Sequence, residues 1–200
     1  MSKTKQTTKA NILKLTIPLF ATYGYDKVSM RQIAKAVGIK AASLYHHFPD
    51  KQALYIEALS QAFSRHADFM NESFALQVSP EQRLHQLILQ LCTLVNEDPD
   101  FRKLMQRELM DGDEKRLQFL AKHVFGDFFH DMNALCLSFA PGQDPHLMTV
   151  SVLGLVVYHF QLSPVRSFLP GFQDSHNDSD VIAEHVFTLL KNGYAKALMK

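Results

Sequence analysis

The segment SMRQIAKAVGIKAASLYHHFPDK, residues 29–51, is the most informative part of this 200-residue chain. Ser29 followed by Gln32 has the spacing of a capping box, so we expect a helix that begins there and ends at Gly38. A second short helix is expected over residues 41–48, because a Pro-Asp pair follows it. Two short helices joined by a three- to four-residue turn that contains a glycine predict a helix-turn-helix.

Apolar and polar side chains divide between two faces of this pair of helices. Four apolar residues are expected to lock the helices together: Ala34, Val37, Ile39 and Leu44. The polar side chains of the outer face would be free to meet DNA: Arg31, Lys40, Ser43, Tyr45, His46, His47 and Lys51. In such a motif the second helix lies in the major groove, with its N-terminal residues at the base edges.

Positive charge is concentrated around this motif. Residues 1–55 hold nine lysine or arginine residues and two aspartates, a net charge of +7, whereas residues 56–200 carry −6. A nearly neutral chain with one basic end is typical of a polyanion-binding module joined to a body with another task.

The flanking sequence is helical nearly throughout and contains no convincing strand. Before the motif, one apolar helical face that ends at Gly24 is expected, with Pro18 weakening or kinking the helix; its residues are Ile12, Leu15, Leu19 and Tyr23. After the motif, helices are expected over residues 51–72, 80–97, 100–111, 113–139, 145–162 and 180–199, with a loop over 163–179. We therefore predict an all-α protein with a three-helix helix-turn-helix DNA-binding domain, residues 1–55, and a larger helical domain, residues 56–200.

The string GIKAASLYHHFPDKQAL, residues 38–54, resembles the N-terminal domain of the TetR family of bacterial transcription regulators (TetR/AcrR type). The resemblance lies in its Leu-Tyr-x-His-Phe core and in the lysine that opens the next helix, and it covers roughly residues 8–55. It implies a homodimer on a palindromic operator, with residues 56–200 as the effector-binding and dimerisation domain. Repression relieved by a ligand is the family's usual behaviour, with activation as the alternative, and the helix that begins at Lys51 would carry the signal. We expect the ligand to be small and largely hydrophobic.

The resemblance also assigns DNA contacts by motif position. Phosphate contacts suit Ser29, Tyr45, His47 and Lys51, whereas base edges suit Arg31, Ser43 and His46. Lys40 and Ala41 depart from the family pattern, in which a small hydroxyl residue usually caps this helix. A lysine there forgoes the cap but adds a cation near the groove.

Large, soft side chains in the second part of the chain could line an apolar effector cavity. The residues that we assign to this pocket, with two histidines for selectivity, are Phe63, His66, Phe69, Phe101, Met105, Leu109, Phe119, His123 and Phe128. Ordinary helix packing is the alternative for each of them, so the pocket rests more on the resemblance than on the residues.

Histidine and aspartate also recur at helical spacing, at positions 123, 127, 130 and 131. Both residue types ligate metals, yet a solvated polar face explains the same pattern. We predict neither a metal nor a cofactor.

Two apolar stripes near the C-terminus predict dimerisation through the last two helices. The first stripe consists of Val150, Leu153, Gly154, Val157 and Tyr158, and the second of Val186, Phe187, Leu190, Tyr194 and Leu198. Two such stripes in each chain suit a four-helix bundle between subunits, whereas packing within one chain is the competing interpretation.

Other classes of protein are less well supported. No Gly-rich phosphate loop, nucleophile motif or paired-carboxylate arrangement indicates an enzyme. Two cysteines predict no disulfide framework, and no secretory signal or membrane span is expected. We therefore expect a cytoplasmic regulator, associated with the nucleoid when bound to DNA; the alternatives are a nonspecific DNA-binding protein and a helical enzyme.

Overall fold

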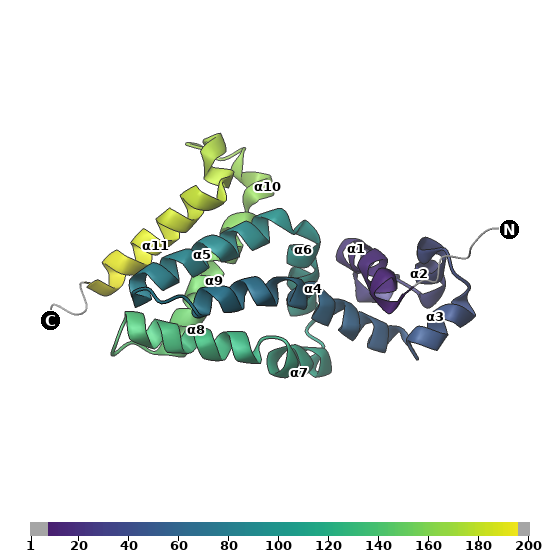
Figure 1. Cartoon of the computed structure of the whole chain (residues 1–200). Coiled ribbons are helices and arrows are strands. Elements are labelled where there is room, and N and C mark those ends of the chain that lie inside the picture. Colours follow the sequence, from purple (N-terminus) through teal and green to yellow (C-terminus); the bar gives the residue numbers. More distant parts are fainter. Residues whose placement is uncertain (1–7, 196–200) are drawn as a thin grey trace. The chain divides into compact units, whose positions relative to one another are not determined.

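Eleven α-helices and one 3-10 helix make up the computed structural model over residues 8–195, and this range contains no β-strand (Figure 1). The structure describes these residues apart from the side chains of residues 64–72, 194 and 195. The predicted all-α class is confirmed.

The chain divides into two compact units, each of which is discontinuous in sequence. Unit 1 comprises residues up to Arg65 together with Pro99–Val124, and unit 2 comprises His66–Asp98 and the residues from Phe125 onward. Unit 1 holds α1 (Lys9–Lys27), α2 (Met30–Val37), α3 (Ala41–His47), the first part of α4 (Lys51–Phe74), α6 (Pro99–Asp111) and α7 (Glu114–His123). Unit 2 holds the end of α4, α5 (Pro80–Glu97), α8 (Gly126–Phe139), α9 (Pro145–Gln161), α10 (Ser163–Arg166), η1 (Asp174–Asn177) and α11 (Ser179–Ala195).

The local signals of the helix-turn-helix are confirmed. Ser29 and Gln32 form the capping box that begins α2, and Gly38 ends it in the left-handed conformation at φ +78°. Asp50 begins α4, because its Oδ1 accepts a hydrogen bond of 2.8 Å from the amide of Ala53. Leu44 and Phe48 are fully buried and anchor α3 against the rest of unit 1.

The buried face of α1 differs from the predicted one. Leu15 and Tyr23 are 41% and 56% exposed, and Leu19 is only half-buried. The buried face instead consists of Ile12, Leu13, Thr16, Ile17, Phe20, Ala21 and Gly24. Both series have helical spacing, but the observed one places two adjacent residues in each turn and therefore buries a wider stripe. The helix is interrupted at Gly24 and not at Pro18.

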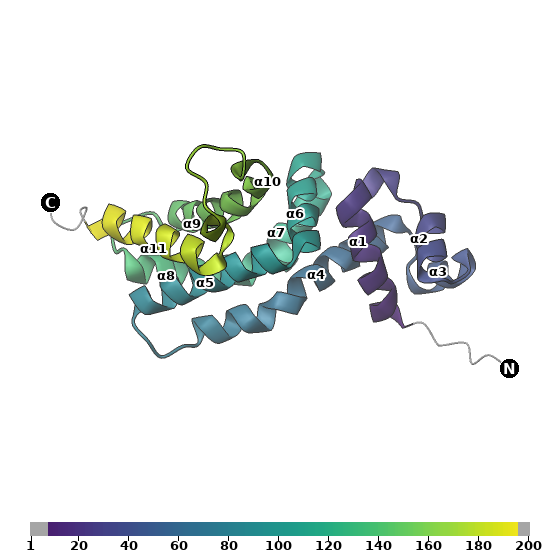
Figure 2. The ribbon, with the colours of Figure 1, turned by 90° about the horizontal axis from the view of Figure 1, so that it is seen from above.

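Unit 2 is built around one core shared by α5, α8, α9 and α11, which lie side by side in both ribbon views (Figures 1 and 2). The capping box of Ser79 and Gln82 begins α5, with Pro80 at the first helical position. The helix expected over residues 80–97 is confirmed, and its inner face buries Leu84, Leu87, Ile88, Leu91 and Val95.

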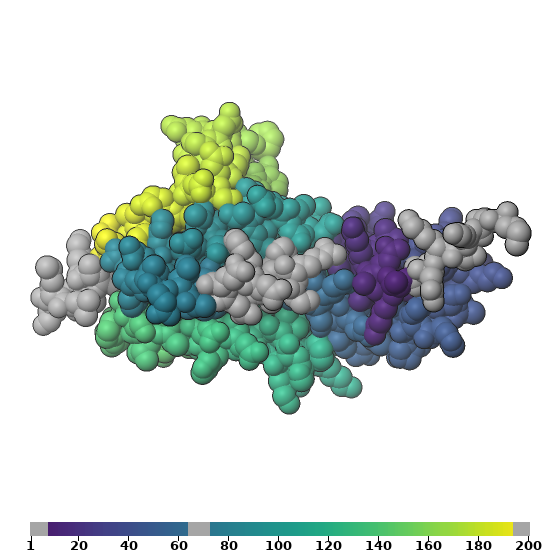
Figure 3. Space-filling model, viewed as in Figure 1, coloured from purple at the N-terminus to yellow at the C-terminus, as the bar shows by residue number. Residues whose placement is uncertain are grey.

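Two predicted segments in the second half are wrong in detail. The single helix expected over residues 113–139 is two helices, separated at Val124 and Phe125. The loop expected over residues 163–179 contains α10 and η1. This segment protrudes from unit 2 (Figure 3), and Phe168 within it is 83% exposed.

The predicted dimerisation stripe of α11 is a further correction. Val186, Phe187 and Leu190 belong to the core of unit 2, packed within the chain itself, because they face α5 and α9. The side chain of Tyr194 and the whole of Leu198, from the same stripe, lie outside the part of the chain that the structure describes.

Candidate nucleic-acid interface and effector cavity

The outer surface of α3 is the most exposed helical surface of the predicted motif. Of its seven residues only Leu44 is buried, so Ala41, Ser43, Tyr45, His46 and His47 all face solvent. Tyr45 is 51% exposed although it is a large aromatic residue. Leu44 and the following Phe48 hold α3 in place. The exposed side chains of the helix can therefore enter a DNA groove without any change in these buried contacts.

A shallow groove of about 470 Å³ lies between α2 and the start of α3. It is lined by Ser29, Arg31, Gln32, Ala34, Lys35, Ile39 and Ala41. Three residues of the predicted DNA-binding set line this groove, namely Ser29, Arg31 and Ala41. The Arg31 and Lys35 side chains make the groove basic.

The Ser29 hydroxyl already has two partners inside the protein. It donates to Gln32 Oε1 at 2.8 Å and accepts from the Gln32 amide at 3.3 Å. A phosphate contact by this hydroxyl would compete with the cap of α2.

Lys51 is not the free cation that the sequence predicted. Its Nζ donates a hydrogen bond of 3.0 Å to the carbonyl of Tyr25 and lies 4.1 Å from the centroid of the Tyr25 ring. Because an ammonium group has three N–H bonds, two remain for a phosphate. Sequence reasoning missed this contact because 26 residues separate the partners and no local pattern joins them.

Other basic residues of the motif differ in their surroundings. Lys40 precedes α3 without a side-chain cap, as expected, and its side chain is exposed. Lys9 forms a salt bridge of 2.6 Å with Glu57, so it is tied to α4. Lys3 and Lys5 lie outside the described residues.

The residues predicted for an effector pocket do not line either cavity described here. Phe63 packs edge-on against Phe101 at 4.8 Å in unit 1, which is ordinary helix packing. Leu109 is 66% exposed, because it lies on the outer face of α6. Met105, Phe119 and His123 also belong to unit 1, whereas Phe128 packs against the core of unit 2. The side chains of His66 and Phe69 lie outside the described residues.

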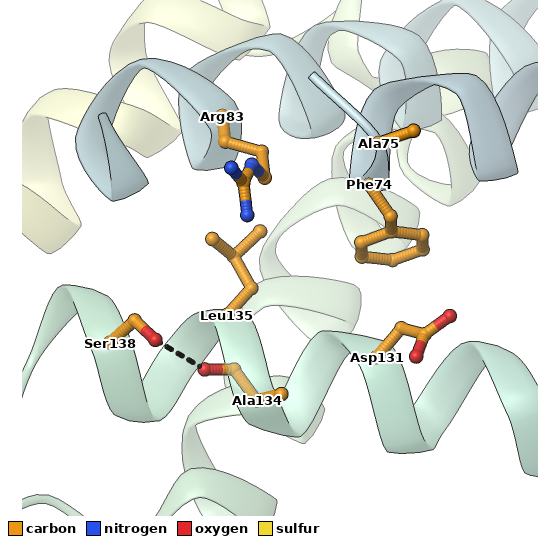
Figure 4. Close-up of a pocket in the computed structure, with 7 residues that line it drawn as sticks. All are labelled: Phe74, Ala75, Arg83, Asp131, Ala134, Leu135 and Ser138. Atoms are coloured by element: carbon orange, nitrogen blue, oxygen red, sulfur yellow. Dashed lines mark hydrogen bonds between the residues drawn. The ribbon is translucent and has the colours of Figure 1, made fainter. Parts of the chain in front are cut away.

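A cavity of about 440 Å³ lies instead within unit 2, between α8 and the residues that connect α4 to α5 (Figure 4). It is lined by Phe74, Ala75, Arg83, Asp131, Ala134, Leu135 and Ser138. The four α8 residues follow helical spacing and form one stripe. Figure 4 shows Arg83 extending from α5 toward Leu135, with Phe74 reaching toward the same helix.

Arg83 makes this cavity polar at one end. Its Nη2 donates to the carbonyl of Leu76 at 2.6 Å, which fixes the guanidinium against the connecting segment. Its Nε is buried without an acceptor among the described residues. An unpaired buried N–H is costly, so an acceptor atom brought by a ligand or water would stabilise this arrangement.

The structure gives no support to the weak metal pattern at positions 123–131. Within the described residues, no group of three or more His, Cys, Asp or Glu side chains could hold a metal ion. His123 ends α7, whereas Asp127, His130 and Asp131 belong to α8, so the continuous helix that the spacing assumed does not exist. No helix of the part that the structure describes is long and apolar enough to cross a membrane.

Comparison with known proteins bears on both parts of the chain. Residues 12–58 match the family model described as bacterial regulatory proteins, tetR family. The biofilm operon icaADBC negative transcriptional regulator IcaR of Staphylococcus epidermidis is 37% identical over 62 residues, which are 31% of this chain and 34% of that protein. The chain therefore matches about a third of the length of this relative.

Two solved structures show the same fold over nearly the whole chain. The transcriptional regulator FadR of Bacillus subtilis, solved with stearoyl-CoA, has a TM-score of 0.78 at 16% identity and covers 93% of this chain and 99% of its own. AibR, solved with isovaleryl coenzyme A and operator DNA, has a TM-score of 0.71 at 20% identity and covers 90% and 96%. Residues 12–58, which include the helix-turn-helix, are therefore similar to the N-terminal part of bacterial regulatory proteins of the tetR family.

Proposed function

We propose that the chain is a ligand-responsive transcription repressor that binds a palindromic operator as a homodimer and is released by a small, largely hydrophobic effector. The observation that carries this proposal is the surface of α3, which exposes every side chain except Leu44 in a part of the chain with net charge +7. Nothing in ordinary folding requires a tyrosine and two histidines to be exposed on so short a helix.

The contacts at the operator follow from the chemistry of this surface. Arg31, Ser43 and His46 would read base edges, while Tyr45, His47 and Lys51 would bind phosphates and set the register. Lys40 adds a cation at the start of α3. Two copies of α3 would lie about 34 Å apart in successive major grooves.

Selection of genomic fragments by the purified chain at near-physiological salt tests DNA recognition. Tyr45→Ala should abolish selection of the site, whereas Tyr23→Ala, which removes an equally exposed tyrosine from α1, should preserve it. Equal recovery of random fragments by the wild-type chain would favour a nonspecific DNA-binding protein. Recovery of nothing would refute DNA binding.

The effector is proposed to bind the cavity lined by Arg83 and Leu135. An apolar floor with a guanidinium at one end suits a ligand with an apolar body and an oxygen-bearing group. The regulators FadR and AibR, to which the fold is similar, were solved with acyl-CoA thioesters, so stearoyl-CoA and isovaleryl-CoA are the first probes. Because α4 contributes residues to both units, its displacement by a ligand would change the operator fit.

Filling the cavity tests its role. Ala134→Phe should abolish thermal stabilisation by the thioester that binds, while Leu137→Phe, on the same helix but outside the cavity, should preserve it. The bound thioester should weaken operator binding, and the operator should weaken thioester binding by the same factor. Turnover of the thioester would favour an enzyme instead.

We propose further that the dimer forms through α9, whose outer face exposes Leu147, Val150 and Tyr158 around Gly154. An apolar face of this kind on a monomer usually marks an interface. A DNA-bound regulator of this type would act in the cytosol at the nucleoid.

A further inference from the structure

The ring of Tyr25, which follows the Gly24 break of α1, is in contact with two cations of unit 1. The Nζ atom of Lys51 is 4.1 Å from the centroid of the ring, and the guanidinium carbon of Arg116 is 4.7 Å from it. The backbone carbonyl of Tyr25 also accepts the 3.0 Å hydrogen bond from Lys51. Both cation-to-ring distances are within the range of a cation–π interaction.

Arg116 is held in place by partners on α6 and at the start of α7. It is only 7% exposed, and its Nε donates a hydrogen bond of 2.7 Å to the fully buried Glu108. Asp113, the N-cap of α7, lies 3.7 Å from its Nη1. The guanidinium is therefore fixed by α6 and α7 and cannot follow a displaced ring.

Lys51 is the first residue of α4 and follows α3 after a three-residue turn. A long side chain in this position would normally sample many rotamers, and ordering it at a phosphate would cost entropy. The ring and the carbonyl of Tyr25 already restrict it, which leaves two N–H bonds directed elsewhere.

We propose that Tyr25 is a positioning residue that holds Lys51 for a phosphate of the operator, and that Arg116 fixes the ring from α7. This proposal rests on the proposed DNA-binding function. It adds a route by which a movement of α6 and α7 changes DNA affinity without moving α3.

The test measures the affinity of the full chain for its selected operator over a series of salt concentrations. Lys51→Met should weaken binding about fivefold to tenfold and reduce the slope of log K against log salt by about 0.9 for each phosphate that is no longer neutralised. Tyr25→Leu removes the ring but keeps the backbone carbonyl and the Lys51 charge, so it should weaken binding less than Lys51→Met and reduce the slope only in part. Tyr25→Phe keeps the ring and should match the wild-type chain. Tyr25→Leu combined with Lys51→Met should be no weaker than Lys51→Met alone, because both changes remove one interaction.

A second pair of variants keeps the proposal testable if Tyr25→Leu fails to fold. Glu108→Gln with Arg116→Met removes the second cation without leaving a buried charge unpaired. It should weaken binding about threefold and lower the slope relative to the wild-type chain.

The outcomes separate this proposal from the function on which it rests. If Tyr45→Ala abolishes operator binding while Lys51→Met leaves the slope unchanged, DNA binding stands and the role of Tyr25 is refuted. If Lys51→Met lowers the slope but Tyr25→Leu does not, Tyr25 is structural only. If the wild-type chain selects no operator, both proposals fail together.

Discussion

The phenol of Tyr55 on α4 donates a hydrogen bond of 2.7 Å to the carboxylate of Glu108 on α6, and both side chains are buried. The other oxygen of the same carboxylate accepts from Arg116 on α7. One buried group therefore joins three helices of unit 1, two of which are separated in sequence from the helix-turn-helix by α5. A fragment that ended near residue 55 would leave Tyr55 without this acceptor.

Removal of the carboxylate should be far more damaging than removal of the phenol. Glu108→Ala leaves the Arg116 charge buried without its main partner and should destabilise unit 1 by about 3–5 kcal/mol. Tyr55→Phe leaves Glu108 paired with Arg116 and should cost about 1–2 kcal/mol. Urea unfolding followed by tyrosine fluorescence measures both values. Similar costs for the two variants would show that the ion pair adds little.

The elements of this unit were predicted from sequence to different degrees. Local signals sufficed where one residue acts on its own helix, as in the capping box of Ser29 and Gln32 and at Gly38, where α2 ends. The buried cluster around Glu108 was not predicted, because its partners are 8 and 53 residues away and no spacing connects them. The cavity wall on α8 was not predicted either. Asp131 and Leu135 line a cavity only because the fold brings Arg83 of α5 close to them. The DNA-contacting set was assigned through motif position and stays a prediction.

Two glycines of unit 1 should respond differently to alanine. Gly38 has φ +78° and ψ 29°, with no atom within 4 Å of an added Cβ, so Gly38→Ala should cost about 1 kcal/mol. Gly24 has φ +79° and ψ 168°, a region that only glycine commonly adopts, and its added Cβ would lie 3.3 Å from Nη1 of Arg107. Gly24→Ala should therefore cost about 1–3 kcal/mol.

Gly24→Ala also tests the contacts that Arg107 makes with the end of α1. Its Nε and Nη2 donate to the carbonyls of Ala21 and Thr22 at 2.9 and 2.7 Å, which satisfies the end of α1 before the Gly24 break. Thermal unfolding of the two alanine variants compares the costs directly. A larger destabilisation in Gly38→Ala would contradict this account of the break.

Gly154→Arg should dissociate the proposed dimer without unfolding the subunit. No atom lies within 4 Å of a Cβ added at Gly154, so the subunit itself has room for a side chain. A buried arginine without a partner at the centre of an interface is strongly unfavourable. Light scattering should report a monomer for Gly154→Arg and a dimer for Gln118→Arg, an exposed helical control in unit 1. Unchanged association of Gly154→Arg would remove α9 from the interface.

Unit 2 should lose stability as the pH falls below about 6.5, because of His159. Burial lowers the pKa of this imidazole, and the neighbouring Arg166 and His185 lower it further. Below the pKa of the unfolded state, the unfolded chain takes up a proton that the folded chain does not. The free energy of unfolding therefore decreases by at most about 1.4 kcal/mol for each pH unit, and by less where solvent screens this half-buried ring. The decrease continues until the pH reaches the lowered pKa of the folded state.

Denaturant unfolding at pH 7.5 and 5.5 measures this dependence. The difference in stability between the two pH values should be smaller for His159→Gln than for the wild-type chain, because the glutamine takes up no proton in either state. His46→Gln on α3 is the matched control and should behave like the wild-type chain. An equal difference in all three chains would assign the pH dependence to other groups.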